Sequence, residues 1–154
     1  MKIKIRNATI ADSNGLVELN KKCLPLYYSV MEYFILCLSP NHLILIVEDE
    51  DNNNKMICYM VGRFTGAEKN FHIMSIGVDD SYRSKGIGSI VINYLINKLK
   101  GDYDNITLYV HTENVKGIKF YQRNGFIIVE TLLNYYRGDL NAKSQDAYTM
   151  KKSI

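Results

Sequence analysis

The spacing of apolar residues changes along this 154-residue chain between the period of strands and the period of helices. Ile3, Ile5 and, after a break, Ile10 alternate with polar residues and predict a first strand. A helix is expected to begin near Asp12, and Pro25 ends it because proline cannot continue a helix. The chain therefore opens with a strand and a helix.

The next segment predicts a second helix and a hairpin. Ser29 and Glu32 have the spacing of a capping box, which opens a helix that ends at about Leu38. Leu43–Val47 and Met56–Phe64 are expected to be two strands. The short polar tract DEDNNNK between them is typical of a hairpin loop rather than of a domain boundary.

A strand, a loop and a helix follow in the second half. Phe71–Val78 is an apolar run, and the segment ending at Leu99 repeats apolar residues at three- and four-residue intervals. A right-handed crossover of this kind makes Phe71–Val78 parallel to the next strand, Ile106–His111. The remaining expected elements are a short helix over Val115–Arg123 and strands over Phe126–Leu133 and Ala147–Met150.

This order of elements predicts one α/β domain over residues 1–154, a mixed sheet with helices on its faces. The chain is 47% apolar and 23% charged, as in ordinary globular proteins. A net charge of +3 is too small to favour nucleic-acid or membrane binding. We expect MKIKIRNATI not to be a signal peptide, because it lacks a continuous apolar run. No apolar run is long enough to span a bilayer, so we expect a cytoplasmic protein.

Three cysteines are far apart in the sequence. Cys23, Cys37 and Cys58 have no metal-like spacing, so we expect reduced thiols and no metal site. A functional cysteine is the less favoured alternative.

The segment YRSKGIGSI carries the clearest chemical signal. Gly86 and Gly88 allow a close approach of the backbone to a ligand. The amides of Lys85–Ser89 lie where a helix begins, and Arg83 adds positive charge beside Lys85. These features predict a diphosphate site, although a helix start with incidental basic residues remains an alternative.

The loop matches neither a P-loop nor a dinucleotide-binding fingerprint, because Val91 stands where the third glycine of the fingerprint belongs. Its form, Arg-x-x-Gly-x-Gly, resembles the acyl-CoA pyrophosphate loop of the GNAT acetyltransferase superfamily, and the later segment HTENVKGIKFYQRNGF is also similar to that superfamily. The resemblance implies the GNAT fold, a mostly antiparallel sheet of about seven strands with about four helices. It also implies acetyl-CoA as cosubstrate, bound by Ile76, Gly77, Val78, Arg83, Ser84, Lys85, Gly86, Ile87, Gly88, Ser89, Asn114 and Tyr121.

Three further segments, LPLYYS, NYYRG (Asn134–Gly138) and DAYTM, resemble Nα-acetyltransferases, most closely the NatE-type catalytic subunit. The resemblance implies direct transfer of acetyl to a protein N-terminus, Met followed by an apolar residue, in a ternary complex. It also implies a possible auxiliary subunit that docks at the ribosome. The residues that it places around the substrate are Leu24, Pro25, Leu26, Tyr28, Met74, Tyr135 and Tyr136.

An α-amine has a pKa of about 8, so a weak base acting through a water can deprotonate it. His72 and Tyr109 lie where such a base is expected, although the NatE-type resemblance implies tyrosine at the first position and histidine at the second. Both residues could instead be structural, His72 on the surface and Tyr109 in the core. His111 would share a face with Tyr109 and is the reserve candidate.

The resemblance also assigns Tyr121 to the departing thiolate and Asn114 to the pantetheine amides. Each has a structural alternative, a core aromatic for Tyr121 and a helix N-cap for Asn114. The pair Tyr135 and Tyr136 could also pack at a sheet edge. At the level of function, the alternatives are acetylation of lysine or small amines on the same fold, and a non-catalytic acyl-CoA-binding subunit.

Overall fold

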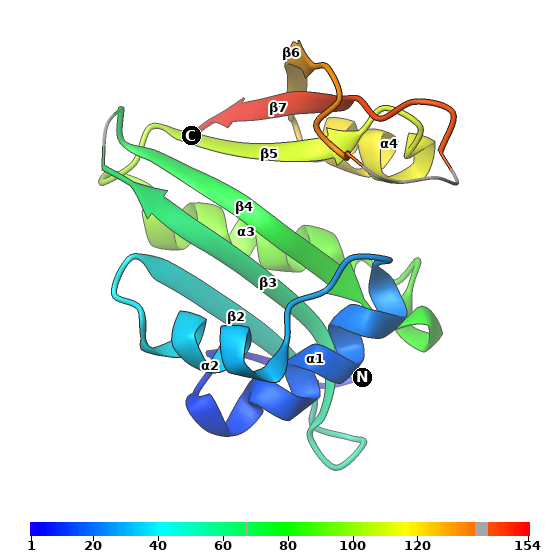
Figure 1. The fold of residues 1–154 in the computed structure, drawn as a ribbon. Helices are drawn as coiled ribbons and strands as arrows, with labels where there is room; N and C mark the ends of the chain where they lie inside the picture. The colour runs from blue at the N-terminus through cyan, green and yellow to red at the C-terminus, as the bar shows by residue number, and fades with distance from the viewer. Residues whose placement is uncertain (67, 138–141) are drawn as a thin grey trace. The chain divides into compact units, whose positions relative to one another are not determined.

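The computed structural model describes residues 1–66, 68–137 and 142–154, so Gly138 of the NYYRG segment lies outside the described residues (Figure 1). These residues form two compact units. Unit 1 comprises Met1–Phe64 and Met74–Leu99, and unit 2 comprises Thr65–Ile73 and Lys100–Ile154. The elements in chain order are β1 (Ile3–Asn7), η1 (Ile10–Asp12), α1 (Ser13–Cys23), α2 (Val30–Leu38), β2 (His42–Asp49), β3 (Lys55–Thr65), β4 (Asn70–Val78), η2 (Asp80–Tyr82), α3 (Ile87–Leu99), β5 (Asn105–His111), α4 (Val115–Arg123), β6 (Ile127–Leu132) and β7 (Ala147–Ser153).

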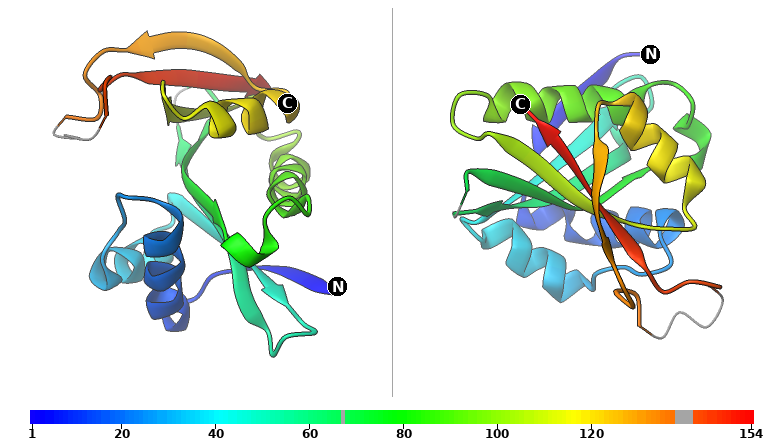
Figure 2. Two further views of the ribbon diagram at one scale, coloured as in Figure 1. Left: turned by 90° about the vertical axis from the view of Figure 1, so that its right-hand side faces the viewer. Right: turned by 90° about the horizontal axis from the view of Figure 1, so that it is seen from above.

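The sheet of unit 1 has the order β1-β2-β3-β4. β1 and β2 are antiparallel with Ile5 opposite Val47, and β2 and β3 are antiparallel with Ile46 opposite Tyr59. Helices α1 and α2 cover one face of these strands and α3 covers the other (Figure 2). The covered faces explain why the run Leu43–Val47 is apolar throughout and buried throughout.

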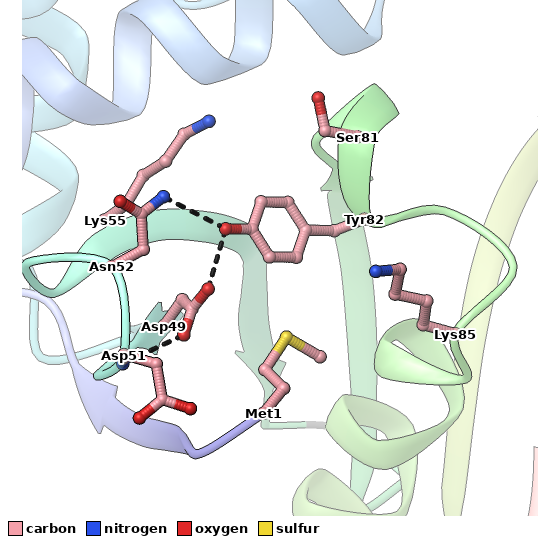
Figure 3. A pocket seen from close by; sticks show the side chains of 8 residues that line it. All are labelled: Met1, Asp49, Asp51, Asn52, Lys55, Ser81, Tyr82 and Lys85. Carbon is pink, nitrogen blue, oxygen red and sulfur yellow. Dashed lines mark hydrogen bonds between the residues drawn. The ribbon is translucent and has the colours of Figure 1, made fainter.

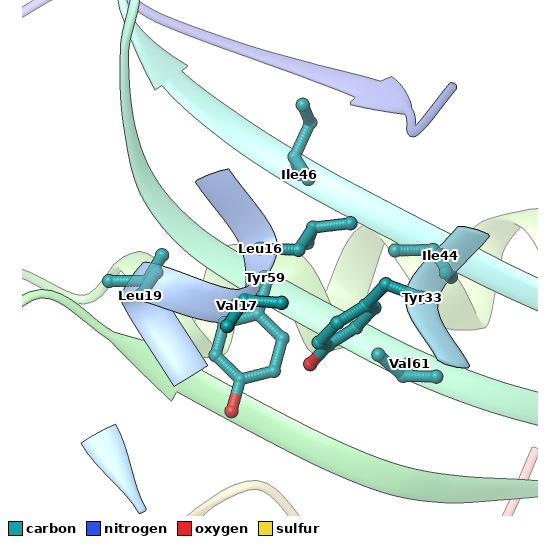
Figure 4. Close-up of a cluster of buried hydrophobic side chains, with 8 residues drawn as sticks. All are labelled: Leu16, Val17, Leu19, Tyr33, Ile44, Ile46, Tyr59 and Val61. Atoms are coloured by element: carbon teal, nitrogen blue, oxygen red, sulfur yellow. The ribbon is translucent and has the colours of Figure 1, made fainter. Parts of the chain in front are cut away.

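A cluster of buried side chains joins α1 and α2 to the sheet of unit 1 (Figure 4). Tyr33 of α2 is fully buried, as are Leu16 of α1 and Tyr59 of β3. Alternate residues of the strands point into this cluster, because side chains of a strand alternate between its two faces. The members are Leu16, Val17, Leu19, Tyr33, Ile44, Ile46, Tyr59 and Val61.

The sheet of unit 2 has the order β4-β5-β7-β6. β4 and β5 are parallel, with His72 beside Thr107, which confirms the predicted parallel pairing of these two strands. β7 runs antiparallel to both β5 and β6. Since β4 contributes residues to both units, the complete strand order is β1-β2-β3-β4-β5-β7-β6, which confirms the mixed, mostly antiparallel sheet of the GNAT fold.

Alternation along the strands of unit 2 separates an apolar face from a polar one. Phe71 and Ile73 of β4 are buried on one face, together with Ile106, Leu108 and Val110 of β5. The opposite face carries the intervening residues of both strands. We call this second surface the polar face. On β7, Thr149 pairs with Tyr109 and Ala147 pairs with His111, so these two residues lie on the same surface. The members of the polar face include His72, Thr107, Tyr109, His111, Ala147 and Thr149.

The predicted elements agree with the structure except at Ile10. This residue does not extend the first strand, because it begins the 3₁₀ turn that leads into α1, and it is exposed. The start of α2 is as predicted, since the Ser29 hydroxyl accepts the Glu32 N–H at 3.1 Å. None of the described helices is both long and apolar enough to cross a bilayer. The assignment of residues 1–154 to a single domain stays a prediction.

Candidate active site

The glycine loop of unit 1 lies between η2 and α3. Its first intrahelical hydrogen bond runs from the Ile90 N–H to the Gly86 carbonyl, at 3.0 Å. The amides of Ile87, Gly88 and Ser89 therefore lie in the first turn of α3, where helical N–H groups have no partner within the helix. Ile87 and Gly88 are themselves buried, so the backbone of this turn is held by the core.

Two residues of the loop have left-handed backbone angles. Gly86 has φ 79° and faces open space where a Cβ would lie, and Ser84 has φ 62°. Such conformations turn successive amides toward one side and form an anion-binding concavity. Ser84 in this conformation could not be foreseen, because a non-glycine residue rarely adopts it.

The segment before the loop is fixed to the β2–β3 hairpin (Figure 3). The Tyr82 hydroxyl donates to Asp49 Oδ2 at 2.7 Å and accepts from Asn52 Nδ2 at 3.2 Å. These groups border a pocket of about 470 Å³ that Lys85 also lines, with its ammonium 5.6 Å from the centre of the Tyr82 ring. The anchor at Tyr82 therefore positions the start of the glycine loop.

Arg83 is oriented by its neighbours. Its Nε donates to the Val78 carbonyl at 3.2 Å and its Nη1 lies 2.9 Å from Asp80 Oδ1. About half of the Arg83 side chain is exposed. The open position beside Gly86, the helix-start amides and the charges of Arg83 and Lys85 together fit a diphosphate such as that of acetyl-CoA.

The strand that precedes the loop contributes Ile76, Gly77 and Val78, all in β4. Gly77 has a packing role, because a Cβ at this position would lie 2.7 Å from both Cys23 Cβ and the Tyr59 ring. Ile76 and Val78 are half-buried. Contact of these three residues with acetyl-CoA stays a prediction.

The predicted substrate loop, Leu24–Tyr28, is tied to the core by Asn20, which the sequence analysis did not single out. Asn20 Oδ1 accepts the Tyr28 N–H at 3.2 Å and the Tyr33 hydroxyl at 2.7 Å. Its Nδ2 donates to the Tyr59 hydroxyl at 3.0 Å. Leu26 of this loop is 73% exposed. The loop therefore presents an apolar side chain to solvent while its Tyr28 end is hydrogen-bonded to Asn20.

The Asn20 network continues into β4. The Tyr59 and Ser75 hydroxyl oxygens are 2.8 Å apart, so Ser75 is a hydrogen-bonded core residue. Met74, its neighbour, is half-buried and packs against the cluster of unit 1. Pro25 is exposed. The substrate roles of Met74 and Pro25 stay predictions.

In unit 2, His72 and Tyr109 lie side by side on the polar face. Their ring centres are 4.4 Å apart. His72 is only 6% exposed, so the alternative of a surface histidine is wrong. Its Nδ1 is 2.8 Å from Thr107 Oγ1, which also accepts a hydrogen bond from Asn70 Nδ2 at 2.8 Å. The pair predicted to handle the proton is thus adjacent and oriented by a second layer of polar groups.

The predicted tyrosine pair packs on the same face. The ring centres of Tyr135 and Tyr109 are 5.0 Å apart. Tyr136 stacks on His111, with 5.0 Å between the ring centres and 24° between the ring planes. The two tyrosines follow β6 rather than forming part of a strand, so the alternative of strand packing at a sheet edge does not describe them. Burial, with a smaller contribution from Tyr135, raises the pKa of Tyr136 to about 12. The ring therefore stays neutral and offers a hydroxyl proton.

Tyr121 lies in α4, with its ring 5.2 Å from Phe120 and 5.8 Å from Phe126. Burial raises the pKa of its phenol above the usual range, with a smaller contribution from Tyr136, so the hydroxyl remains protonated at neutral pH. Both the core role and the predicted role of a donor are compatible with this environment.

Asn114 is the N-cap of α4. Its Oδ1 accepts the Gly117 N–H at 2.9 Å, as the structural alternative predicted. The cap uses the acceptor Oδ1, so the donor Nδ2 of this side chain could still donate to a pantetheine carbonyl. That contact stays a prediction.

The described residues contain no group of three or more His, Cys, Asp or Glu side chains arranged to hold a metal ion. Burial raises the pKa of the Cys23, Cys37 and Cys58 thiols, so none has the character of an activated nucleophile.

Residues 13–126 match the Acetyltransferase (GNAT) family. N-alpha-acetyltransferase 50 of Danio rerio is 30% identical over 155 residues, which cover 99% of this chain and 89% of that protein. An N-alpha-acetyltransferase of Saccharolobus solfataricus is 28% identical over 97% of this chain and 92% of that protein.

Solved structures agree with this relationship. The ribosomal-protein-S18-alanine N-acetyltransferase of Escherichia coli has the same fold, with a TM-score of 0.86, 20% identity and coverage of 99% of this chain and 94% of that one. Arabidopsis thaliana Naa50, in complex with the bisubstrate analogue CoA-Ac-MVNAL, gives a TM-score of 0.81 at 25% identity, with both chains fully covered. The protein therefore belongs to the GNAT family and is an acetyl-CoA-dependent N-acetyltransferase.

Proposed function

We propose that this enzyme transfers acetyl from acetyl-CoA to the free α-amine of a protein N-terminus, with Met followed by an apolar residue preferred. The observation that carries the proposal is the contact of His72 with Tyr109, 4.4 Å between ring centres, on the face where Tyr135 and Tyr136 also pack. A neutral proton acceptor beside apolar, hydroxyl-tipped rings suits an amine that is only weakly basic.

Unit 1 would hold the acetyl donor. The helix-start amides of Ile87, Gly88 and Ser89 and the side chains of Arg83 and Lys85 would bind its diphosphate. The Gly86 position would let the backbone approach the phosphate oxygens, since its missing Cβ leaves open space. The bound thioester supplies an electrophilic carbonyl and a thiolate leaving group.

The reaction would be a direct transfer in a ternary complex. The neutral amine nitrogen attacks the thioester carbonyl carbon, a C–N bond forms and the C–S bond breaks. The nitrogen loses one proton, and the departing thiolate gains one, so the products are an Nα-acetylated chain and CoA. No covalent enzyme intermediate is needed, in keeping with the raised thiol pKa values.

His72 would take the amine proton through a water. When its Nδ1–H donates to Thr107 Oγ1, 2.8 Å away, the proton-accepting lone pair is on Nε2. Asn70 holds Thr107 in place from the other side. Tyr109 would orient the same water through its hydroxyl. The roles of His72 and Tyr109 would then be exchanged, because the family resemblance implies tyrosine at position 72 and histidine at position 109.

Tyr121 would donate a hydrogen bond to the thiolate. A phenol whose pKa is raised by burial keeps its proton in the ground state and can stabilise negative charge as it develops on sulfur. Asn114 would reach the pantetheine amides with Nδ2, while its Oδ1 caps α4.

Support for the acceptor comes from both the chain and its relatives. The relatives of Danio rerio and Saccharolobus solfataricus are named as N-alpha-acetyltransferases, and the peptide of the analogue bound to Arabidopsis Naa50 begins with Met-Val. In unit 1, we propose that Leu24, Leu26 and Tyr28 of the substrate loop are acceptor-binding residues. In unit 2, we propose the same role for Tyr135 and Tyr136. We further propose that the enzyme works in the cytoplasm as a single domain, with an auxiliary ribosome-docking subunit as an optional partner.

A pair of matched peptides tests the acceptor. One begins with free Met-Leu and lacks lysine; its twin has a blocked N-terminus and one internal lysine. We expect product only from the first, measured by mass spectrometry with acetyl-CoA. Product only from the twin would establish a lysine acetyltransferase, and binding of acetyl-CoA with product from neither would establish a non-catalytic subunit.

Two substitutions test the proton acceptor. His72→Ala is expected to lower kcat about 100-fold and Tyr109→Phe about tenfold, while the KM for acetyl-CoA changes little. If both variants keep kcat within a few-fold of wild type, the pair is not catalytic.

A further inference from the structure

Three buried polar side-chain atoms have no hydrogen-bond partner among the residues that the structure describes. They are Asn70 Oδ1, His111 Nε2 and Thr149 Oγ1, and all three belong to unit 2. Buried polar groups are nearly always paired, because an unpaired group loses its hydrogen bonds to water without replacement. A concentration of such groups in one unit therefore calls for a ligand.

The three residues share the polar face. His111 lies two residues beyond Tyr109 on β5, and Thr149 of β7 lies directly opposite Tyr109 in the antiparallel register. Residues opposite one another in a sheet present their side chains on the same side. Asn70 is placed on that side by its hydrogen bond to Thr107. The unpartnered atoms thus lie on the face that carries His72 and Tyr109.

The hydrogen bonding of His111 fixes its tautomer. The Glu113 N–H donates to His111 Nδ1 at 3.1 Å, so Nδ1 carries the lone pair. In the neutral imidazole the proton is then on Nε2, the atom that has no partner among the described residues. With its lone pair already engaged by a backbone amide, His111 is arranged as a hydrogen-bond donor and not as the reserve base.

We infer that His111 Nε2–H and the Thr149 hydroxyl bind the main chain of the acceptor peptide, with His111 donating to a carbonyl. This inference rests on the proposed function. A peptide backbone is the neutral ligand whose carbonyl and N–H groups match one fixed donor and one hydroxyl that can both donate and accept.

The rings above this face suit the same ligand. Tyr136 stacks on His111 and packs against Tyr135, with ring centres 4.9 Å apart. A bound backbone would give hydrogen-bond partners to His111 Nε2 and Thr149 Oγ1 while the tyrosine rings contact its side chains. His111 and Thr149 are thus binding residues and take no part in bond making.

Peptide kinetics of three variants test the inference. His111→Leu is expected to raise the peptide KM about tenfold, and Thr149→Val, of nearly equal volume, about fivefold, with the KM for acetyl-CoA unchanged. His111→Gln, whose Nε2 amide keeps a donor at similar reach, should stay within about threefold of wild type. Thermal unfolding of each variant checks that the fold is kept.

Ester substitutions in the peptide identify which carbonyl accepts the hydrogen bond from His111. Each of the first three peptide bonds is replaced in turn by an ester, which weakens the carbonyl acceptor. One of these esters should raise the KM of the wild-type enzyme several-fold and have no further effect on His111→Leu.

The outcomes separate the inference from the function on which it rests. Suppose that wild type acetylates peptides and that His111→Leu and Thr149→Val keep the peptide KM within twofold of the wild-type value. The inference is then wrong and the proposed function stands. The same conclusion follows if the two variants lower kcat and leave the peptide KM unchanged. If wild type acetylates no peptide, the proposed function fails first and the inference with it. If all three esters change the peptide KM equally in wild type and in His111→Leu, the inference is also wrong.

Discussion

The two units treat their buried polar side chains in opposite ways. In unit 1, Asn20, Tyr33, Tyr59 and Ser75 form a continuous network with distances of 2.7 to 3.0 Å. In unit 2, among the described residues, Asn70, His111 and Thr149 each retain a buried polar atom without a partner. Complete pairing stabilises a fold, whereas incomplete pairing leaves groups that can recognise a substrate. The complete network of unit 1 thus supports the substrate loop, and the unpaired atoms of unit 2 are the groups proposed to bind the main chain of the acceptor.

The largest stability effect should come from breaking the network of unit 1. Asn20→Leu leaves the Tyr33 and Tyr59 hydroxyls and the Tyr28 N–H without their shared partner. We expect the free energy of unfolding, measured with urea, to fall by about 3 kcal/mol. Asn14→Leu on the exposed side of the same helix is the control. Equal losses from the two variants would show that the network adds nothing.

A smaller and more direct contrast compares one hydroxyl from each unit. Tyr33→Phe removes a paired donor and should cost about 1 kcal/mol of unfolding free energy. Thr149→Val removes a hydroxyl that has no partner among the described residues, so stability should be unchanged or higher. Thermal unfolding of both variants and of wild type measures these differences in stability. A loss of stability in Thr149→Val as large as in Tyr33→Phe would remove the distinction between the units.

The smallest effect concerns acid stability of unit 1. Asp12 accepts two hydrogen bonds from Arg6 at 2.9 Å, and this pairing is the main reason that the pKa of its carboxyl is lowered. Because the folded-state pKa lies below the unfolded-state value, the stabilisation is present above about pH 4 and is lost as pH falls through the lowered pKa.

Asp12→Asn should therefore be less stable than wild type by about 0.5 kcal/mol at pH 7, with the difference decreasing as the pH is lowered from 7 to 3. Urea unfolding at both pH values measures it. Glu50→Gln, which alters the more exposed pair with Lys2, is the control and should change stability less at both values. A difference for Asp12→Asn that is as large at pH 3 as at pH 7 would assign the effect to packing.

Much of this arrangement follows from local sequence. Apolar alternation places Phe71 and Ile73 on one side of β4 and His72 on the other, and the Ser29 cap begins α2, because both depend on short-range geometry. The helix start after the glycine loop is confirmed for the same reason, since it is encoded within the nine residues of YRSKGIGSI.

Other features depend on contacts between distant segments. The packing role of Gly77 needs Cys23 and Tyr59, which come from α1 and β3. The stacking of Tyr136 on His111 depends on the turn after β6, where Asn134 has φ 54°. No local pattern indicates which polar atoms stay unpaired after folding, so the sequence did not point to the role now proposed for Thr149.

The central claim is that the helix-start amides after Ser84 bind the diphosphate of acetyl-CoA. The most direct measurement is a titration of the isotope-labelled protein with acetyl-CoA, followed by backbone amide NMR. We expect saturable binding with the largest shifts at Gly86, Ile87, Gly88 and Ser89, and loss of these shifts in Gly86→Val, whose side chain disfavours the backbone angle of 79°. No binding at millimolar acetyl-CoA, or saturable binding that leaves these four amides unperturbed, would contradict the claim.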